Sequence, residues 1–142
     1  MAAKFVTNRR VEFSDTDAAG IMHFAAFFRM MEQAEHELLR SVGLSVVMHD
    51  ATGKISWPRV NAKCDFQSAA RFEELLEIEV RIARLGKSSV TYRHRFSRGG
   101  EQLATGEITA VCCRIREGKP PKSIAVPAAM AKKLKPFVAG AE

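Results

Sequence analysis

Two carboxylates, Asp15 and Asp17, stand two positions apart in the segment Asp15-Thr-Asp-Ala-Ala-Gly20, immediately before the strongest helical pattern of the chain. Small and polar residues that end in glycine predict a tight turn. A helix that begins after such a turn presents unpaired backbone N–H groups and the positive end of its dipole. Those N–H groups can hold a carbonyl oxygen as it becomes an oxyanion, and a neighbouring carboxylate can attack the carbonyl carbon or deprotonate a water molecule. The residue types at this turn therefore suit acyl transfer without a metal.

The same turn also has a purely structural interpretation. Asp and Thr are favoured at helix N-caps and in turns, where their side chains bond to nearby backbone groups. Gly20 supports the chemical interpretation, because a residue without a side chain lets a substrate approach the backbone closely. We expect no metal and no separate cofactor, since no group of His, Cys and carboxylate residues has the spacing of metal ligands.

The helix that must position this turn is predicted for residues 22–42. Its apolar residues recur at helical spacing and form one stripe; they are Phe24, Phe27, Phe28, Met31, Leu38, Leu39 and Val42. Gly43 stands where a C-terminal cap belongs. One face of this helix should therefore lie against a sheet.

Strands are predicted around the helix from alternation of apolar and polar residues with a period of two. They cover residues 5–14, 55–66, 76–82, 90–96 and 102–116. A hairpin turn is expected at 97–100, a connection at 85–88 and an irregular connection at 45–53. Pro127 is expected to open a short helix over 128–135, which Pro136 ends.

This order of elements predicts an α+β fold in a single domain over residues 1–142. Strands joined by short turns must be mostly antiparallel, and one long helix lies across a sheet of five to six strands. One helix cannot cover such a sheet on both sides, so a partner subunit should cover what remains.

Length and composition agree with one globular domain, because the chain has 142 residues, of which 46% are apolar and 27% charged. No apolar run reaches the roughly 18 residues of a membrane-spanning helix, and the N-terminus lacks the apolar region of a signal peptide. Three cysteines, Cys64, Cys112 and Cys113, cannot all pair within one chain. Free thiols are typical of a reducing compartment, so we expect a cytoplasmic protein.

The net charge of +6 is concentrated in one stretch. Six cations and no carboxylate lie between Val80 and Gly100, at positions 81, 84, 87, 93, 95 and 98. Such an excess predicts either an anionic ligand at this place or the solvated face of a strand. Nucleic acid is disfavoured as a partner, because the only aromatic residues of the stretch, Tyr92 and Phe96, fall on its apolar face.

The segment Val11-Glu-Phe-Ser-Asp-Thr-Asp-Ala-Ala-Gly-Ile21, with the helix after it, resembles the hotdog-fold acyl-CoA thioesterases. It is most similar to the 4-hydroxybenzoyl-CoA thioesterase family with its YbgC-like branch, whose signature is an Asp-x-Asp-x-x-Gly-Ile/Val turn. Phe66-Gln-Ser-Ala-Ala-Arg-Phe-Glu-Glu-Leu75 looks like the family's Phe-x-x-Pro-Ala-Arg-x-x-Asp segment, with Ala69 in place of the proline. Leu85-Gly-Lys-Ser-Ser-Val90 looks like its Gly-Lys-Ser-Ser turn.

The resemblance implies one long helix wrapped by an antiparallel sheet, and homodimers or homotetramers with active sites at the subunit interface. It implies that Asp17 is the catalytic carboxylate, either as nucleophile through an acyl-enzyme anhydride or as general base on water. The backbone N–H of Phe24 would polarise the thioester carbonyl. Asp15 would hold the turn.

By the same resemblance, Lys87, Ser88 and Ser89 would contact the phosphates of coenzyme A, which is then part of the substrate and not a cofactor. Gly20 is a candidate for substrate contact on its own account, because it has no side chain. His23 stands beside the turn, where many family members have an aromatic residue, and is a second candidate for substrate binding.

Two residues do not fit the patterns in which they stand. Glu35 falls within the apolar stripe of the helix, so it requires either an arginine partner or a place in the wall of a wet pocket. His94 shares the apolar face of its strand and is expected to be a core histidine.

The leading hypothesis is an enzyme that hydrolyses an acyl-CoA thioester to a carboxylic acid and free coenzyme A. A hotdog hydratase or dehydratase would instead pair His23 with Asp17 or Glu37, but the proline-containing signatures around such histidines are absent. A non-catalytic acyl-CoA-binding module would keep the pocket and Lys87 without needing Asp17.

Overall fold

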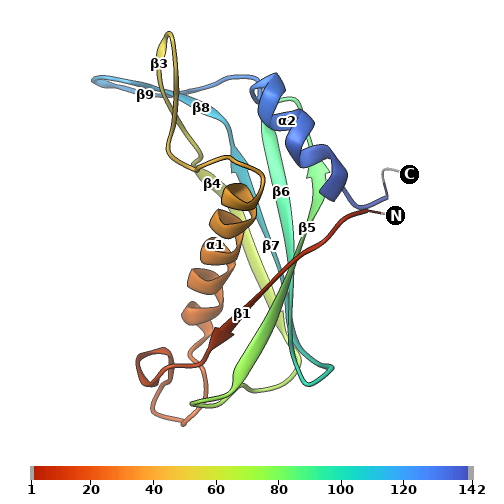
Figure 1. Ribbon diagram of the computed structural model, residues 1–142. Coiled ribbons are helices and arrows are strands. Elements are labelled where there is room, and N and C mark those ends of the chain that lie inside the picture. The colour runs from red at the N-terminus through yellow and green to blue at the C-terminus, as the bar shows by residue number, and fades with distance from the viewer. Residues whose placement is uncertain (1, 141–142) are drawn as a thin grey trace.

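A computed structural model describes residues 2–140 and shows one long helix lying against an antiparallel sheet (Figure 1). The sheet has five strands in the order β1-β5-β6-β7-β4. The bounds are Phe5–Arg10 for β1, Arg59–Phe66 for β4, Leu75–Leu85 for β5, Ser89–Arg98 for β6 and Glu101–Val111 for β7. This arrangement confirms the predicted α+β architecture.

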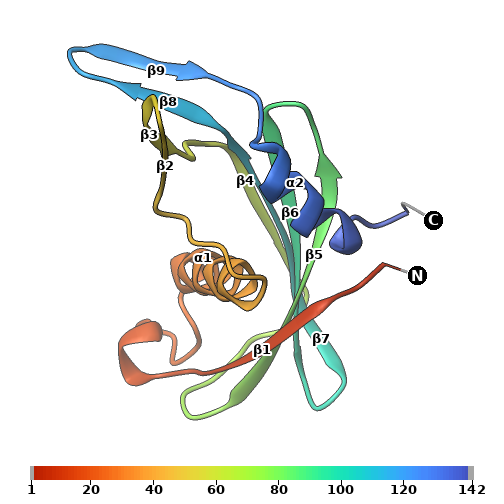
Figure 2. The ribbon, with the colours of Figure 1, turned by 45° about the horizontal axis from the view of Figure 1, so that its top comes forward.

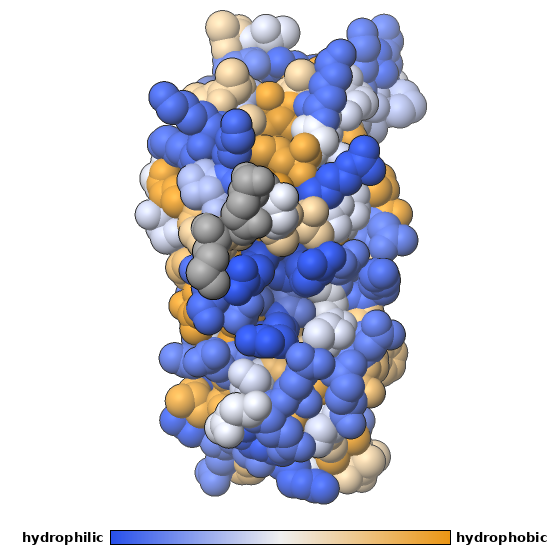
Figure 3. Space-filling view, turned by 90° about the vertical axis from the view of Figure 1, so that its right-hand side faces the viewer, coloured by the Kyte–Doolittle hydropathy of each residue, from blue (hydrophilic) through white to orange (hydrophobic). Residues whose placement is uncertain are grey.

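Alternation along the strands separates a buried face from a charged one. On the inner face Ile82 opposes Tyr92, and Tyr92 opposes Ile108, and all three side chains are buried. The intervening positions of β5 and β6 carry charged side chains such as Arg93, whose guanidinium lies 3.0 Å from Glu107. Figure 3 looks onto the side of the molecule turned away from the helix and shows hydrophilic side chains over much of it.

Helix α1 spans Phe24–Ser41 and packs its apolar stripe on the inner face of the sheet. Its buried side chains are Ala26, Phe27, Met30, Met31, Ala34, Glu35, Leu38 and Leu39. Gly106 on β7 makes room for this packing, because a Cβ there would lie 2.2 Å from the Met31 methyl carbon. The predicted helix is thus confirmed, with the start two residues later and the end one residue earlier.

A second, four-stranded sheet lies beyond one end of the first (Figure 2). Its order is β2-β3-β8-β9, with β2 at Met48–Asp50, β3 at Gly53–Ser56, β8 at Cys113–Arg116 and β9 at Lys119–Ser123. The prediction of one strand over 102–116 was wrong, because the chain leaves the first sheet at Cys112. There the Cys112 N–H donates to the Ser88 carbonyl, at 2.7 Å.

Other boundaries also differ from the prediction. The strand predicted over residues 55–66 is divided between β3 and β4, because the chain passes through Trp57 and Pro58 without strand pairing. Residues 45–53, predicted as irregular, contain β2, and β9 was not predicted because Lys119-Pro-Pro-Lys-Ser123 has no apolar alternation. Two prolines are compatible with β9 because it is an edge strand. The strand predicted over residues 5–14 ends at Arg10, and a 3₁₀ turn, Phe13–Asp15, follows it.

The C-terminal helix α2 spans Ala128–Leu134, close to the prediction. Pro127 is its N-cap and not its first helical residue, and a 3₁₀ turn at Lys135–Phe137 takes in Pro136. The carbonyl of Pro136 accepts the N–H of Ala3 at 2.8 Å, which holds the two described ends of the chain together (Figure 1).

Across residues 2–140, the structure contains no helix that combines the length and the apolar character needed to cross a membrane. The same range contains no group of three or more His, Cys, Asp and Glu side chains placed to hold a metal ion.

Candidate active site

The turn before α1 is held by backbone hydrogen bonds that place the Asp17 side chain. The Asp17 N–H donates to the Ile21 carbonyl, and its own carbonyl accepts from Gly20, both at 2.9 Å. Gly20 has a φ of +79°, a left-handed conformation that glycine adopts without strain. The Asp17 carboxylate accepts the Ala19 N–H at 2.9 Å, and the side chain is half-buried.

Asp15 has a different role from Asp17. Its carboxylate accepts the Glu12 N–H at 2.9 Å and lies 3.5 Å from the Arg29 guanidinium. Its carbonyl accepts the His23 N–H at 2.7 Å. These contacts tie the turn to the start of α1, which agrees with the structural role expected for Asp15.

The first turn of α1 leaves one donor without a partner. His23 is the N-cap, and its Nδ1 accepts the Ala25 N–H at 3.0 Å, while its carbonyl accepts the Ala26 N–H at 2.9 Å. The Phe24 N–H has no acceptor among the described residues. This is the N–H expected to polarise a thioester carbonyl.

Asp17 and Phe24 line the same pocket, which has a volume of about 360 Å³. Its other lining residues are Ile21, Met22, Phe27, Phe66, Gln67, Ser68, Ala69 and Ala70. Phe27 forms an edge-to-face pair with Phe66 at a ring-centroid distance of 5.1 Å, so the pocket is bounded by an aromatic cluster. Gly20 and His23, both expected to bind substrate, do not line it.

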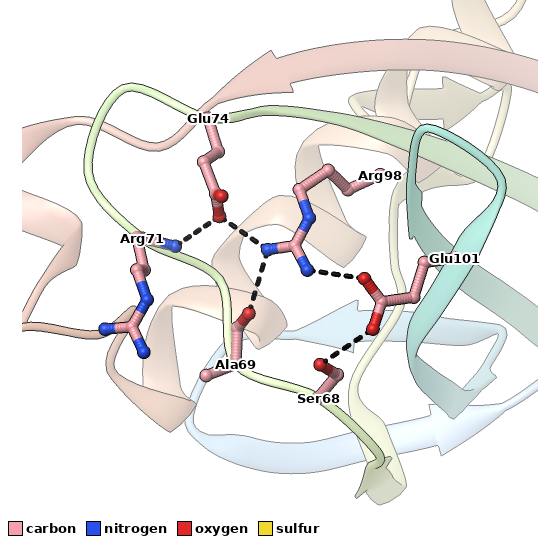
Figure 4. Close-up of polar contacts among 6 residues, drawn as sticks. All are labelled: Ser68, Ala69, Arg71, Glu74, Arg98 and Glu101. Atoms are coloured by element: carbon pink, nitrogen blue, oxygen red, sulfur yellow. Dashed lines mark hydrogen bonds and ion pairs between the residues drawn. The ribbon is translucent and has the colours of Figure 1, made fainter.

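The wall formed by residues 67–70 was not expected to belong to the site, although the resemblance had singled out the segment that contains it. Arg98 on β6 holds this wall from outside, as Figure 4 shows. Its guanidinium donates to the Ala69 carbonyl at 3.0 Å and to Glu74 at 2.7 Å. Its other terminal nitrogen donates to Glu101 at 2.6 Å, and Glu101 accepts the Ser68 hydroxyl at 3.1 Å.

The opposite side of the wall is attached to the Asp17 turn. The Met22 N–H donates to the Ala70 carbonyl at 2.8 Å, and Ile21 forms a β-bridge with Arg71. Hydrogen bonds from two directions thus fix the wall relative to the carboxylate. Neither Arg98 nor these backbone contacts could be found from the spacing of residues in the sequence.

Glu35 lies inside the fold and forms the ion pair that one of its two interpretations required. The Arg59 guanidinium donates to both carboxylate oxygens, at 2.8 and 3.0 Å. Burial raises the pKa of Glu35, and Arg59 opposes that shift.

His94 is fully buried, as expected for a core histidine. Neither ring nitrogen has a partner among the described residues. Burial lowers the pKa of His94 to about 4.

None of the three cysteines is placed to act as a nucleophile. All three are free thiols, as expected. Burial raises the pKa of Cys64 and that of Cys112 to about 11, and the thiolate is the reactive form. None of the three cysteines lines the pocket of Asp17.

Lys87, Ser88 and Ser89 lie far from Asp17 within one chain. Lys87 and Ser88 connect β5 to β6, and Ser89 begins β6, at the end of the sheet opposite the Asp17 turn (Figure 1). Helix α1 has 18 residues and is therefore about 27 Å long, and it separates the two ends. The Val126 N–H donates to the Lys87 carbonyl at 2.8 Å, and the Gly86 N–H donates to Ser89 at the same distance.

The six cations of residues 81–98 fall into paired and unpaired groups among the described residues. Glu79 pairs with Arg81 and Arg95 on the outer face of the sheet, at 2.8 and 3.0 Å. Arg93 and Arg98 are paired as well, so four of the six cations have carboxylate partners on the strands. Arg84 and Lys87 have no carboxylate partner within residues 2–140.

We define the cationic end as residues 48–56, 84–88, 113–123 and 128–137, which lie at the same end of the molecule as the β5–β6 turn (Figures 1 and 2). These segments contain ten Lys and Arg residues and two carboxylates, a net charge of +8 against +6 for the whole chain. The cations come from four separate parts of the sequence, and only the fold brings them together.

Comparison with known proteins identifies the family. Residues 11–134 match the model of the thioesterase-like superfamily. A 1,4-dihydroxy-2-naphthoyl-CoA hydrolase of a Synechococcus species is 33% identical over 110 residues, 72% of each chain. The hydrolase of the same name from Synechococcus elongatus is 27% identical over 111 residues, 78% of this chain and 82% of the relative.

Two solved structures have the same fold over nearly their whole length. A 1,4-dihydroxy-2-naphthoyl-CoA thioesterase from Synechocystis superposes with a TM-score of 0.84 at 24% identity and covers 94% of this chain and 96% of its own. A gentisyl-coenzyme A thioesterase superposes with a TM-score of 0.78 at 25% identity and covers 91% and 98%. By its sequence match from Val11 to Leu134, this chain belongs to the thioesterase-like superfamily.

Proposed function

We propose that the protein is an acyl-CoA thioesterase in which Asp17 is the catalytic carboxylate and the Phe24 N–H stabilises the oxyanion. Thioester hydrolysis follows from the family. The observation that carries the assignment of the site is the pocket itself, because Asp17, which is half-buried, and Phe24, whose N–H is unpaired among the described residues, line the same largely apolar pocket. A preorganised N–H at a developing oxyanion lowers the barrier to acyl transfer.

Two routes fit this geometry. In one, an Asp17 oxygen attacks the thioester carbon, the thiolate of coenzyme A leaves and takes a proton from solvent, and water hydrolyses the resulting anhydride. In the other, Asp17 removes a proton from a water molecule that attacks the same carbon. A single turnover in ¹⁸O-labelled water separates them, since only the anhydride route can leave the label in the Asp17 side chain.

The acyl group that suits the pocket is apolar and flat. Phe24, Phe27 and Phe66 line the pocket, and aromatic side chains pack well against planar rings. According to their names, the relatives act on naphthoyl and gentisyl thioesters. Both acyl groups are aromatic. We therefore expect aromatic acyl-CoAs to be hydrolysed with a higher kcat/KM than short aliphatic ones.

The direct test is release of coenzyme A from a panel of aromatic, short, branched and long acyl-CoAs. We expect turnover of at least one substrate and a loss of about 10²-fold or more in Asp17→Asn. Tight binding of acyl-CoA without turnover would favour the non-catalytic binding module, and hydration of an enoyl-CoA would favour the hydratase. Unchanged turnover in Asp17→Asn would remove Asp17 from the mechanism.

A second copy of the chain completes the site in this proposal. Strand β4 is an edge of the sheet, hydrogen-bonded only to β7 within the described residues. Its side chains Val60 and Phe66 are 62% and 50% exposed, and an open apolar edge favours pairing with another strand. Phe66 also lines the pocket of Asp17. Sedimentation at micromolar concentration should give a dimer or tetramer, and a monomer would contradict this part of the proposal.

The same pairing supports the role proposed for Lys87, Ser88 and Ser89. Two identical edges related by a two-fold axis run antiparallel, so the Phe66 end of one β4 lies beside the Arg59 end of the other. The cationic end of one subunit is then placed toward the pocket of its partner. Its charge of +8 suits the phosphates of coenzyme A.

The three cysteines support a cytoplasmic location in this proposal. All three are free thiols, which are typical of a reducing compartment.

A further inference from the structure

His23 occupies the N-cap of α1 in an unusual way for that position. Ser, Thr, Asp and Asn are the residues that usually cap a helix, because a short side-chain oxygen reaches the second or third N–H. Here the Nδ1 of an imidazole accepts the Ala25 N–H at 3.0 Å. The His23 ring also stacks on the Phe24 ring, with centroids 4.5 Å apart and an interplanar angle of 25°.

The cap and the stack act on the peptide unit that carries the proposed oxyanion donor. The Ala25 N–H is occupied by Nδ1, and the Ala26 N–H by the His23 carbonyl. The Phe24 N–H lies between these contacts and is the one donor they leave unpaired among the described residues. The His23 N–H is itself bonded to the Asp15 carbonyl at 2.7 Å, so the residue is anchored to the turn that carries Asp17.

The location of His23 argues against direct contact with the substrate. His23 does not line the pocket that Asp17 and Phe24 share. Its Nδ1 is used by the cap, which requires that nitrogen to be unprotonated and to act as an acceptor. A substrate-binding role would have to rely on Nε2 alone.

We propose that His23 is a positioning residue, which aims the Phe24 N–H at the reacting carbonyl by capping Ala25 and holding the Phe24 ring. This inference rests on the proposed function of Asp17 and Phe24, and deepens it. It predicts that His23 contributes to the rate of the chemical step and little to substrate binding, because a misaligned oxyanion donor is lost in the transition state.

The test compares His23→Ala with His23→Asn, using the acyl-CoA that the wild-type protein hydrolyses best. Asn restores an acceptor at the N-cap, whereas Ala does not. For His23→Ala we expect kcat to fall about tenfold with KM within about twofold of wild type. For His23→Asn we expect kcat within about threefold of wild type. Gln102→Ala, an exposed residue on β7 outside both the pocket and the cationic end, is the control and should change neither constant.

Each outcome separates positioning from the other roles. A purely structural cap would lower the thermal midpoint of His23→Ala and leave kcat unchanged at a temperature where the variant is folded by circular dichroism, which would overturn the proposal. A substrate-binding histidine would raise KM in both variants, with no rescue by Asn, and would also overturn it. Failure of the proposed function is recognised separately, because the wild-type protein itself would then release no coenzyme A.

Discussion

The two ends of the five-stranded sheet differ in how their charges are compensated. At the Asp17 end, Arg29 lies beside Asp15, and Arg98 is paired with both Glu74 and Glu101, so the cations serve to hold the turn and the pocket wall. At the cationic end, Arg84 and Lys87 have no carboxylate partner within the described residues. The first end provides a small apolar cavity, and the second provides a charged surface.

In the proposed function one thioester substrate needs both ends, although they are far apart in a single chain. Strand β5 has 11 residues and is about 36 Å long, which is the distance between the ends along the sheet. The acyl group suits the pocket, and the phosphates of coenzyme A suit the cations. A second subunit in antiparallel orientation is the simplest way to bring them together.

The largest effect is expected at Asp17. Asp17→Asn should lower kcat by about 10²-fold or more, because the variant loses the nucleophile or base and keeps the shape of the turn. Asp15→Asn is the matched control two residues away. Its amide oxygen can still accept the Glu12 N–H, so kcat should stay within about threefold of wild type. Equal losses in both variants would show that the turn is only structural.

A smaller effect is expected at Arg98, which holds the pocket wall without touching the pocket. Arg98→Ala removes the contacts to Ala69 and Glu101, so the wall loses its outer support. We expect KM to rise about tenfold for the largest acyl group of the panel and by less for the smallest, with kcat less affected. Arg93→Ala, on the same strand and paired with Glu107, is the control. An equal change in KM for all acyl groups would argue against a role in shaping the pocket.

At the cationic end, Lys87→Ala should raise KM for acyl-CoA about threefold to tenfold and leave kcat within about twofold. The same variant should hydrolyse the matching acyl-pantetheine like wild type, because that substrate has no nucleotide phosphates. Lys4→Ala, an exposed lysine outside the cationic end, serves as control. If Lys87→Ala raised KM equally for acyl-CoA and for acyl-pantetheine, the proposed contact of Lys87 with the phosphates would be wrong.

The region between the two ends should influence stability and leave the chemistry unchanged. Burial lowers the pKa of His94 to about 4, whereas an unfolded histidine has a pKa near 6.5. Between these values the unfolded state binds a proton that the folded state excludes, so the free energy of unfolding falls as the pH drops from about 6.5 to 4. The full difference is about 3 kcal/mol.

Urea denaturation at a series of pH values measures this contribution. His94→Leu should flatten the pH dependence across that window, while His49→Gln, at an exposed position, should leave it as in wild type. If His94→Leu retained the wild-type slope, His94 would not be the group that excludes the proton.

The sequence predicted the helix and most strands because their apolar residues follow a clear period over many positions. The Asp17 turn was predictable from its residue types, and the ion pair of Glu35 was one of two roles that its place in an apolar stripe allowed. For the cations over residues 81–98 the sequence left two interpretations open, and only the structure shows that Glu79 and Glu107 pair with Arg81 and Arg93. Contacts such as Arg98 to Ala69 depend on how two hairpins meet, which no local pattern records.

The location of the positive charge was also beyond sequence reasoning. Four segments supply the cationic end, and each one alone looks like an ordinary charged loop, ribbon or helix. One continuous strand was predicted over 102–116 because Cys112 and Cys113 extend its apolar run. The hydrogen bond from Cys112 to Ser88 that redirects the chain is a tertiary contact.

Mixed dimers test most directly whether one active site is built from two chains. One chain would carry Asp17→Asn and the other the pair Arg84→Glu and Lys87→Glu, and the heterodimer would be purified with two different tags. Each parent homodimer is defective, the first in kcat and the second in KM for acyl-CoA. The shared site predicts that the heterodimer regains the wild-type KM with about half the wild-type kcat, because one of its two sites is then intact. A heterodimer that keeps the high KM of the charge-reversed parent would contradict the account, since each site would then use only the cations of its own chain.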